Sequence, residues 1–234
     1  MTGPVDDRHA AHASSDGAIE AVLLDIDGTL LDSNDAHAQA WSDALREAGL
    51  DIGSETVRPL IGMGSDKLLP KLTGISGDSE EGKRLVERSK AIFAKEYLPL
   101  VKPFPQAREL LERMRDDGAT LVVATSAAED ELRGLLAALG AEWLVDEKTT
   151  SSDANRSKPD PDIVRVAVDK AGVGPTQCVM LGDKTALAIE QAEIAAGSKL
   201  AHHGNRRVRH VGVERRAEER QTAGHGRLHV AAKP

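Results

Sequence analysis

The sequence predicts an α/β protein with a doubly wound, Rossmann-like parallel sheet and a small all-helical cap inserted after the first strand. Helix-like and strand-like segments alternate from Ala107 to Leu181, as in a sheet covered by helices. Between Asn34 and Leu98, by contrast, helical patterns follow one another with no strand between them. Ligands of such sheets bind at the carboxyl ends of the strands, so we expect the site there.

The first predicted strand, Ile19–Ile26, is a near-continuous apolar run, which suits a central strand buried on both faces. It ends at two aspartates, Asp25 and Asp27, and the chain then turns at Gly28. Two carboxylates this close repel, and each loses hydration unless a cation or a proton compensates it. A polar strand end or a helix cap explains the pair less well than a metal site or a reaction.

The predicted cap comprises residues 34–103 and divides the catalytic core into residues 19–33 and 104–198. Its expected helices are Asn34–Gly49, a short one within Arg58–Leu72, and Glu80–Leu98. The prolines in Pro103-Phe104-Pro105 make a stiff return to the core. His37 and Trp41, one helical turn apart, favour packing over substrate contact. Arg58 and Lys67 are candidates to reach the distal end of a substrate, against the alternative of a solvated face.

The second half of the core places polar residues at further strand ends. The expected elements are helix Ala107–Asp117, strand Ala119–Thr125, helix Glu129–Leu139, strand Trp143–Asp146, helix Asp160–Ala171 and strand Gln177–Leu181. Thr125 and Ser126 follow one strand, Asp183 follows the last, and Lys158 lies in a polar loop before a helix. Carboxylates at strand ends suit Mg²⁺, which binds few carboxylates together with phosphate oxygens. A hydroxyl and a lysine beside them suit a phosphoryl group.

Composition limits the remaining possibilities. The chain has 234 residues and one cysteine, Cys178, which excludes an internal disulfide framework and suits a reducing, cytoplasmic location. No apolar run is long enough to span a membrane, and residues 1–18 are predicted to be a disordered leader. Residues 199–234 carry a local net charge of +6 against -14 for the rest. This basic tail has no aromatic residue to stack on a base, so we expect no nucleic-acid partner and poor order.

Four separated motifs resemble those of the haloacid dehalogenase superfamily of phosphohydrolases. They are Asp25-Ile-Asp27-Gly28-Thr29-Leu30, Ala124-Thr125-Ser126, Lys158-Pro159 and Gly182-Asp183. The cap directly after the first motif is similar to that of the phosphoglycolate-phosphatase-like and beta-phosphoglucomutase-like subgroup. The resemblance extends from about Ala21 to Gly197.

The resemblance implies a role for each matching residue. Asp25 is the expected nucleophile, and Asp27 protonates the leaving alcohol and then deprotonates the attacking water. Thr125, with Ser126 as the competing hydroxyl and Gly28 at the turn, binds the phosphoryl oxygens, and Lys158 neutralises their charge. Asp25, the main-chain carbonyl of Asp27, and Asp183 are the expected Mg²⁺ ligands. Either hydroxyl is alternatively a simple helix N-cap.

Two features depart from the family pattern. The second acid expected after Asp183 is replaced by Leu187 and Ala188, with Glu190 further on, which predicts a weakened metal site. After Gly197 the expected strand is missing. A one-base shift of reading frame over Ala201–Glu214 can be made to read as a strand and loop, a hypothesis that the encoding DNA tests.

The sequence therefore predicts a cytoplasmic, magnesium-dependent phosphatase of small phosphorylated metabolites, either sugar phosphates or phosphoglycolate-like acids. The alternatives are a phosphosugar mutase and a catalytically impaired relative that binds phosphometabolites. We expect a monomer or a homodimer.

Overall fold

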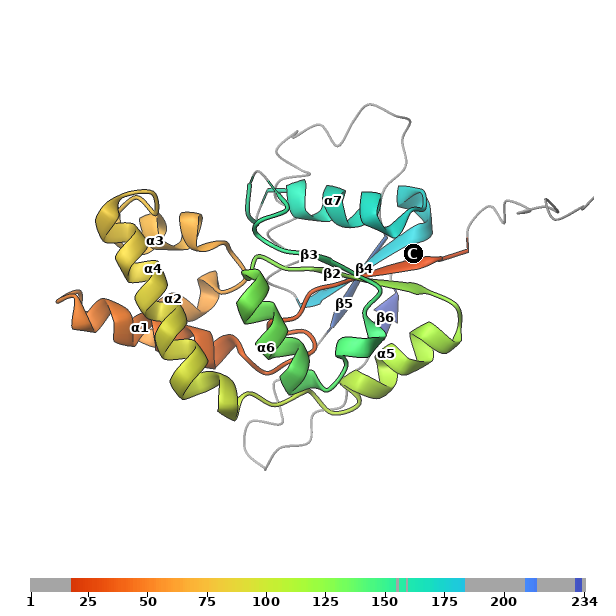
Figure 1. The fold of residues 1–234 in the computed structure, drawn as a ribbon, viewed down its shortest axis with the longest axis horizontal. Helices are drawn as coiled ribbons and strands as arrows, with labels where there is room; N and C mark the ends of the chain where they lie inside the picture. Colours follow the sequence, from red (N-terminus) through yellow and green to blue (C-terminus); the bar gives the residue numbers. More distant parts are fainter. Residues whose placement is uncertain (1–17, 155, 159, 184–208, 214–229, 233–234) are drawn as a thin grey trace, which may run out of the picture.

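The computed structural model describes residues 18–154, 156–158, 160–183, 209–213 and 230–232, the last two ranges as backbone only. Its described strands form one six-stranded sheet in the order β3-β2-β1-β4-β5-β6 (Figure 1). They are β1 (Ala21–Leu24), β2 (Thr120–Ala124), β3 (Glu147–Thr149), β4 (Cys178–Asp183), β5 (Arg209–Val213) and β6 (Val230–Ala232). Neighbouring strands from β3 to β5 pair in parallel, whereas β6 runs antiparallel to β5. The carboxyl ends of β1, β2 and β4 therefore meet at one edge.

Helices cover both faces of the sheet, which confirms the predicted α/β class. They are α5 (Ala107–Asp116), α6 (Glu129–Leu139) and α7 (Asp162–Ala171). Val22 and Leu24 pack in one buried cluster with residues of α5 and α6. Ala21 and Leu23, which point to the opposite face, pack in a second cluster with residues of α7. Figure 1 shows α7 on one side of the sheet and α5 and α6 on the other.

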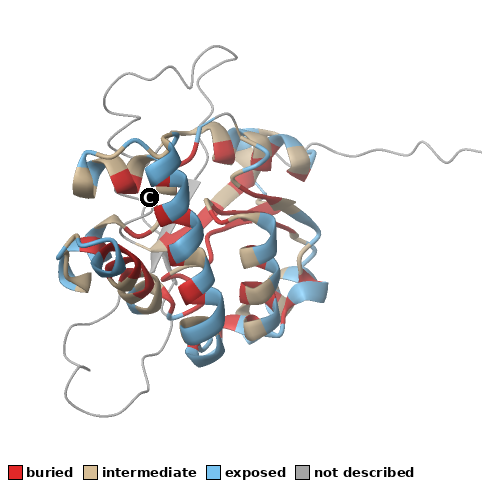
Figure 2. Cartoon of the chain, turned by 60° about the vertical axis from the view of Figure 1, so that its left-hand side comes forward, coloured by how far each residue is buried: buried red, intermediate tan, exposed pale blue. Residues whose placement is uncertain are grey.

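The elements between β1 and α5 are all helices, joined by loops, and we call residues 34–103 the insert. It contains α1 (Asn34–Glu47), α2 (Ser54–Val57), η1 (Arg58–Leu60), α3 (Ser65–Thr73), α4 (Glu80–Ile92), η2 (Phe93–Tyr97) and η3 (Leu98–Leu100). Trp41 packs here in a third buried cluster made only of insert residues. The opposite face of α1, with Ala40 and Ala44, joins the cluster on the sheet. In Figure 2 the buried positions accordingly lie on the inner sides of the helices and on the strands.

The chain leaves and re-enters the core through two adjacent segments. Asp32 N donates to Lys102 O over 2.9 Å, and Phe104 N donates to Leu30 O over 3.0 Å. The prolines on either side of Phe104 leave its own amide as the donor, because proline has none. The insert is thus joined to the core directly behind the first motif.

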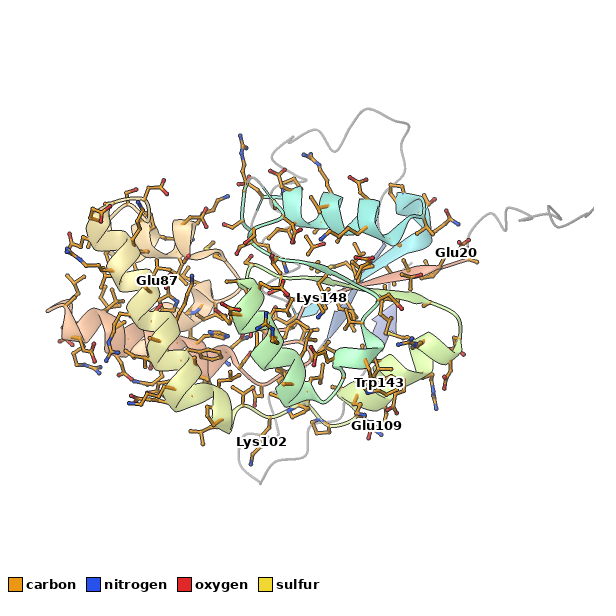
Figure 3. All side chains as sticks on the ribbon, viewed as in Figure 1. Glu20, Glu87, Lys102, Glu109, Trp143 and Lys148 are labelled. Carbon is orange, nitrogen blue, oxygen red and sulfur yellow. The ribbon has the colours of Figure 1, made fainter. Side chains whose placement is uncertain are left out.

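One predicted strand is misplaced. We expected Trp143–Asp146 to be a strand, but Glu142–Leu144 is a short 3₁₀ helix and the strand is β3, which begins at Glu147. Trp143 is 59% exposed beside α5, where Arg108 and Arg115 approach its ring (Figure 3). β3 is an edge strand and contains Glu147 and Lys148, so it has no apolar run by which a hydrophobicity pattern could identify it.

The tail differs in part from the prediction of poor order. Arg209–Val213 pairs in parallel with β4, and Val230–Ala232 pairs with it in turn, so these segments extend the sheet. Backbone pairing needs no apolar side chain, which is why the polar sequence around Arg209 gave a weak signal. The leader up to Gly17, Leu187, Ala188, Glu190 and the rest of the tail lie outside the described residues. Over the described ranges, no helix has the length and apolar character required to cross a bilayer.

Candidate active site

Asp25 and Lys158 form a buried ion pair at the carboxyl end of β1. Lys158 Nζ donates to Asp25 Oδ1 over 2.9 Å, and Thr29 Oγ1 donates to Asp25 Oδ2 over 2.9 Å. Asp25 is 5% exposed and Lys158 is 1% exposed. Burial raises the pKa of Asp25, and Lys158 opposes that rise; the carboxylates of Asp183 and Asp27 add to it. The arrangement fixes both oxygens of a carboxylate, as a nucleophile requires.

The carboxylate of Asp27 faces the insert instead. Ser33 Oγ donates to its Oδ1 over 2.5 Å, and His37 Nε2 lies 2.9 Å from the same oxygen. The His37 ring stacks on Phe93 with 3.8 Å between centroids and 12° between planes. His37 was expected to pack, and it does, but it also contacts a predicted catalytic acid. This contact was not predicted from the sequence.

The Asp27–His37 pair holds a proton between two side chains that are only 13% and 12% exposed. Burial raises the pKa of Asp27, but His37 and the Ser33 hydroxyl outweigh it, so this pKa lies below its ordinary value. Burial lowers the pKa of His37, and Asp27 more than offsets that effect, so this pKa is raised. The pair is therefore an imidazolium beside a carboxylate over a wide range of pH.

Thr125 and Ser126 continue the site at the end of β2. Thr125 Oγ1 accepts a hydrogen bond from Ala127 N over 3.1 Å. Ser126 Oγ accepts from Lys158 N over 3.3 Å and donates to Gly62 O over 3.4 Å. Neither hydroxyl caps α6, whose N-cap is Ala128. The N-cap alternative is therefore wrong, and both side chains line the same cavity as Asp25.

Asp183 closes the site at the end of β4. Its main-chain N donates to Thr29 Oγ1 over 2.8 Å, so Thr29 connects it to Asp25. Asn34 Nδ2 donates to Asp183 Oδ2 over 3.4 Å, while Asn34 Oδ1 is buried without a partner among the described residues. Gly28 has φ +74°, and a Cβ there would lie 2.1 Å from Asn34 Nδ2 and 2.8 Å from Asp183 Oδ2. Only glycine fits at this turn, because any side chain would collide with Asn34 and with the Asp183 carboxylate.

The carboxylates of Asp25 and Asp183, with Asn34 beside them, fit a magnesium ion. Within the described ranges no three His, Cys, Asp or Glu side chains converge as a metal site. Two carboxylates, Asp25 and Asp183, are close enough for the charge of one to raise the pKa of the other. Mg²⁺ usually takes one or two carboxylates and keeps several waters. The buried Asn34 Oδ1 lacks a donor, which such a water would supply.

The insert touches the core through a loop that precedes α3. Gly64 N donates to Lys158 O over 3.1 Å, and Ser157 Oγ donates to Asp66 Oδ1. Lys67 Nζ forms an ion pair with Asp160 Oδ2. Lys67 is therefore not directed at a distal ligand, the first role considered for it, and with 30% of its side chain exposed it is only partly solvated. The contacts join the insert to the segment that carries Lys158.

A cavity of about 120 Å³ lies between the insert and the sheet edge, lined by Asp25, Asp27 and Thr125 from the core. The insert contributes His37 and Trp41, so Trp41 both packs and borders the cavity. Arg58 is not among the lining residues. It is 45% exposed and pairs with Asp35 on the surface, so it does not take the substrate-facing position considered for it.

Glu131, on the first turn of α6, was also missed. It lines the cavity and lies 3.8 Å from His37 Nε2. Its two predecessors, Glu129 and Asp130, are exposed. Acidic residues are common in the first turn of a helix, where they interact favourably with the helix dipole. Glu131 therefore looked like an ordinary residue of that turn, and nothing in the sequence showed that its side chain borders the cavity.

Comparison with known proteins gives a consistent family. Residues 19–192 match the model of the haloacid dehalogenase-like hydrolases. Phosphoglycolate phosphatase of Nitrosospira multiformis is 32% identical over 77% of this chain and 81% of its own length. Validoxylamine A 7'-phosphate phosphatase of Streptomyces hygroscopicus subsp. limoneus is 29% identical over 75% and 83%. The crystal structure of a hydrolase from Pseudomonas syringae superposes with a TM-score of 0.68 and 27% identity, covering 76% of this chain and 81% of that one.

A longer relative matches over the same region. The chloroplastic protein SUPPRESSOR OF QUENCHING 1 of Arabidopsis thaliana is 32% identical over 78% of this chain, and the match spans 18% of its length.

Proposed function

The chain belongs to the haloacid dehalogenase-like hydrolases, and from this we propose that it is a phosphatase of small phosphomonoesters that acts through an aspartyl-phosphate on Asp25. The observation that carries the proposal is the buried Asp25–Lys158 pair beside the Asp27–His37 pair. The first pair orients the carboxylate of Asp25, and the second pair holds a proton that can be transferred. A nucleophile and an acid at one strand end are the two groups that cleavage of an alkyl phosphate needs.

In the first half of the reaction an oxygen of Asp25 attacks phosphorus. The bond from phosphorus to the alcohol oxygen breaks, and its electron pair leaves with that oxygen. Asp27 gives this oxygen a proton, so the product is a neutral alcohol. That proton comes through Asp27 from the His37 imidazolium, whose Nε2 lies 2.9 Å from Asp27 Oδ1, so the step leaves Asp27 as a carboxylate and His37 neutral. The lowered pKa of Asp27 is thereby compatible with its role as an acid, because the pair, rather than the aspartate alone, stores the proton.

In the second half Asp27 accepts a proton from water, and the resulting hydroxide attacks phosphorus. The bond between phosphorus and the Asp25 oxygen breaks, which releases inorganic phosphate and restores the carboxylate. The lowered pKa of Asp27 keeps it ionised and able to accept this proton, which then passes to His37 and restores the imidazolium. The same residue therefore serves both halves.

The phosphoryl group lies among Thr125, Ser126 and the turn at Gly28. The hydroxyls donate to phosphoryl oxygens, and Lys158 Nζ, already 2.9 Å from Asp25, offsets the charge that develops there. Asp25, Asp183 and the main-chain carbonyl of Asp27 hold Mg²⁺ in this proposal. When bound, the ion supplies positive charge beside the phosphate oxygens.

The insert acts as a cap in this proposal. Its loop contacts at Ser157 and Lys158 cover the phosphoryl end, while His37, Trp41 and Phe93 border the remaining space. The leaving alcohol occupies this cavity of about 120 Å³ in the proposal. A cap that encloses the leaving group excludes water until the phosphoryl group has been transferred.

The test is phosphate release by the full chain from a panel of phosphate esters, with Mg²⁺ and with a chelator. We expect release only with Mg²⁺ and a loss of at least roughly 1,000-fold in Asp25→Asn, because the amide is a poor nucleophile. Asp51→Asn, which changes an exposed aspartate of the insert, is the matched control. Release that persists in Asp25→Asn contradicts the nucleophile assignment, and isomerised sugar phosphate without release identifies a mutase.

A further inference from the structure

Glu131 occupies a position on α6 that the helix alone does not explain. The next residue, Leu132, is fully buried, so the first turn of the helix is fixed against the core. The Glu131 side chain is only 19% exposed and borders the cavity, whereas Glu129 and Asp130 face solvent. Burying a carboxylate costs free energy unless it gains hydrogen bonds. Among the described residues Glu131 receives no hydrogen bond, and its contact with His37 Nε2 is 3.8 Å long, so its carboxylate can still accept a hydrogen bond from a ligand.

The position of Glu131 relative to the reacting atoms follows from His37. The Nε2 atom of His37 lies 2.9 Å from Asp27 Oδ1 and 3.8 Å from Glu131 Oε1. Its one N–H therefore goes to the nearer Asp27. In the proposed reaction Asp27 protonates the leaving oxygen, which would place Glu131 beside the carbon atoms that follow that oxygen.

The charges on this side of the cavity favour a neutral leaving group. Asp66 also borders it, as an acceptor of the Ser157 hydroxyl. Both cations that border this side among the described residues already face an acid: the His37 imidazolium lies 2.9 Å from Asp27 Oδ1, and Lys90 Nζ lies 3.0 Å from Glu87, which Figure 3 labels on α4. A carboxylate on the leaving group would thus meet Glu131 with little compensation, whereas hydroxyl groups would donate to it.

We propose that Glu131 is a specificity-determining residue that accepts hydrogen bonds from hydroxyl groups of the leaving alcohol and disfavours leaving groups that carry a carboxylate. This inference rests on the proposed phosphatase function and narrows its substrates to phosphate esters of neutral polyhydroxylated alcohols, such as sugars, over phosphoglycolate. Burial raises the pKa of Glu131 above its ordinary value and the charge of Asp27 adds to the rise, while His37 and Lys90 oppose it. A hydroxyl donor would add a second favourable partner to the carboxylate.

The test compares kcat/KM for fructose 1-phosphate and for phosphoglycolate, both with saturating Mg²⁺. We expect the wild-type chain to prefer the sugar phosphate by at least roughly tenfold, and Glu131→Gln to reduce that ratio by roughly tenfold, since one charged hydrogen bond is exchanged for a neutral one. Asp130→Asn removes an exposed acid from the same turn and should leave the ratio unchanged. Glu131→Asp keeps the charge and should keep the discrimination against phosphoglycolate.

The outcomes separate this inference from the function on which it rests. A wild-type chain that prefers phosphoglycolate, or a ratio that Glu131→Gln leaves unchanged, overturns the inference while the phosphatase function stands. If Glu131→Gln lowers kcat/KM by the same factor for both esters, the inference is also overturned. That pattern would mean that Glu131 positions His37 and does not discriminate between leaving groups. If the wild-type chain releases no phosphate from either ester or from p-nitrophenyl phosphate, the proposed function fails and this inference fails with it.

Discussion

Lys158 and Asp25 are 133 positions apart in the chain, yet their side chains meet over 2.9 Å in a site where both are almost fully buried. Removing one member of such a pair leaves the other as an uncompensated buried charge. We therefore expect Lys158→Met to lower the free energy of unfolding at pH 7 by about 3 kcal/mol. Chemical denaturation measures this, with Lys83→Met, which changes a lysine that is 60% exposed, as the control.

The loss in Lys158→Met should depend on pH. Burial already raises the pKa of Asp25, and without the lysine it rises further. A folded pKa above the unfolded value means that the folded state is penalised where the group is ionised, at higher pH. The deficit should therefore shrink as the pH falls and Asp25 gains a proton. A deficit that is constant with pH contradicts an ionised Asp25.

Asn34 tests the metal site independently of activity. Its Nδ2 donates to Asp183, and its Oδ1 is buried without a partner among the described residues. We expect Asn34→Ala to weaken Mg²⁺ binding by roughly tenfold, as loss of an outer-shell partner does. Calorimetric titration and the rise in Tm on adding Mg²⁺ measure this. Gln39→Ala, on the same helix but bonded to Asp43, is the control, and equal affinity in the two variants counts against a role for Asn34.

The ion pair between Lys67 and Asp160 tests the insert contact. The two side chains are 30% and 14% exposed, so we expect Lys67→Ala to change the free energy of unfolding by less than about 1 kcal/mol. Its larger effect should be local, because Gly64 and Asp66 hold the same loop on Lys158 and Ser157. Hydrogen exchange of residues 61–67 should become faster, whereas Lys71→Ala, further along α3, should leave it unchanged. Unaltered exchange in Lys67→Ala refutes a role for this ion pair in holding the loop on the core.

Tyr97 and Asp43 give a stability prediction away from the site. Tyr97 Oη donates to Asp43 Oδ2 over 2.6 Å and joins the end of the insert to α1. Burial raises the pKa of Asp43, but this bond and those from Gln39 and Arg46 outweigh it and lower that pKa. Tyr97→Phe should cost about 1 kcal/mol at neutral pH.

The pH dependence of that cost has a defined sign. The depressed pKa of Asp43 stabilises the fold above the unfolded value near 3.8 and ceases to do so as the pH falls through the folded value. Burial and Asp43 raise the pKa of Tyr97 to about 12, so its contribution is present below the unfolded value of 10.0 and is lost as the pH rises through 12. The difference between Tyr97→Phe and the wild-type chain should thus fade at both extremes, and denaturation at several pH values checks it.

The sequence was informative where residue type and strand position agreed. Asp25, Thr125 and Asp183 each follow an apolar run, and parallel strands bring such ends together. His37 was missed as a site residue because its helical spacing with Trp41 is also that of a packing face. Glu131 was missed because two exposed acids precede it on the same turn. Which side of a helix meets a cavity depends on tertiary packing, and local patterns do not contain that information.

Covalent labelling of Asp25 tests the central proposal most directly. The full chain is mixed with a ³²P-labelled ester that it cleaves, quenched in acid within the first turnover, and digested for peptide mapping. We expect an acid-stable, hydroxylamine-sensitive phosphate on the peptide that contains Asp25, and none in Asp25→Asn. A single turnover that releases phosphate without any labelled protein, or label on another residue, would contradict the aspartyl-phosphate mechanism.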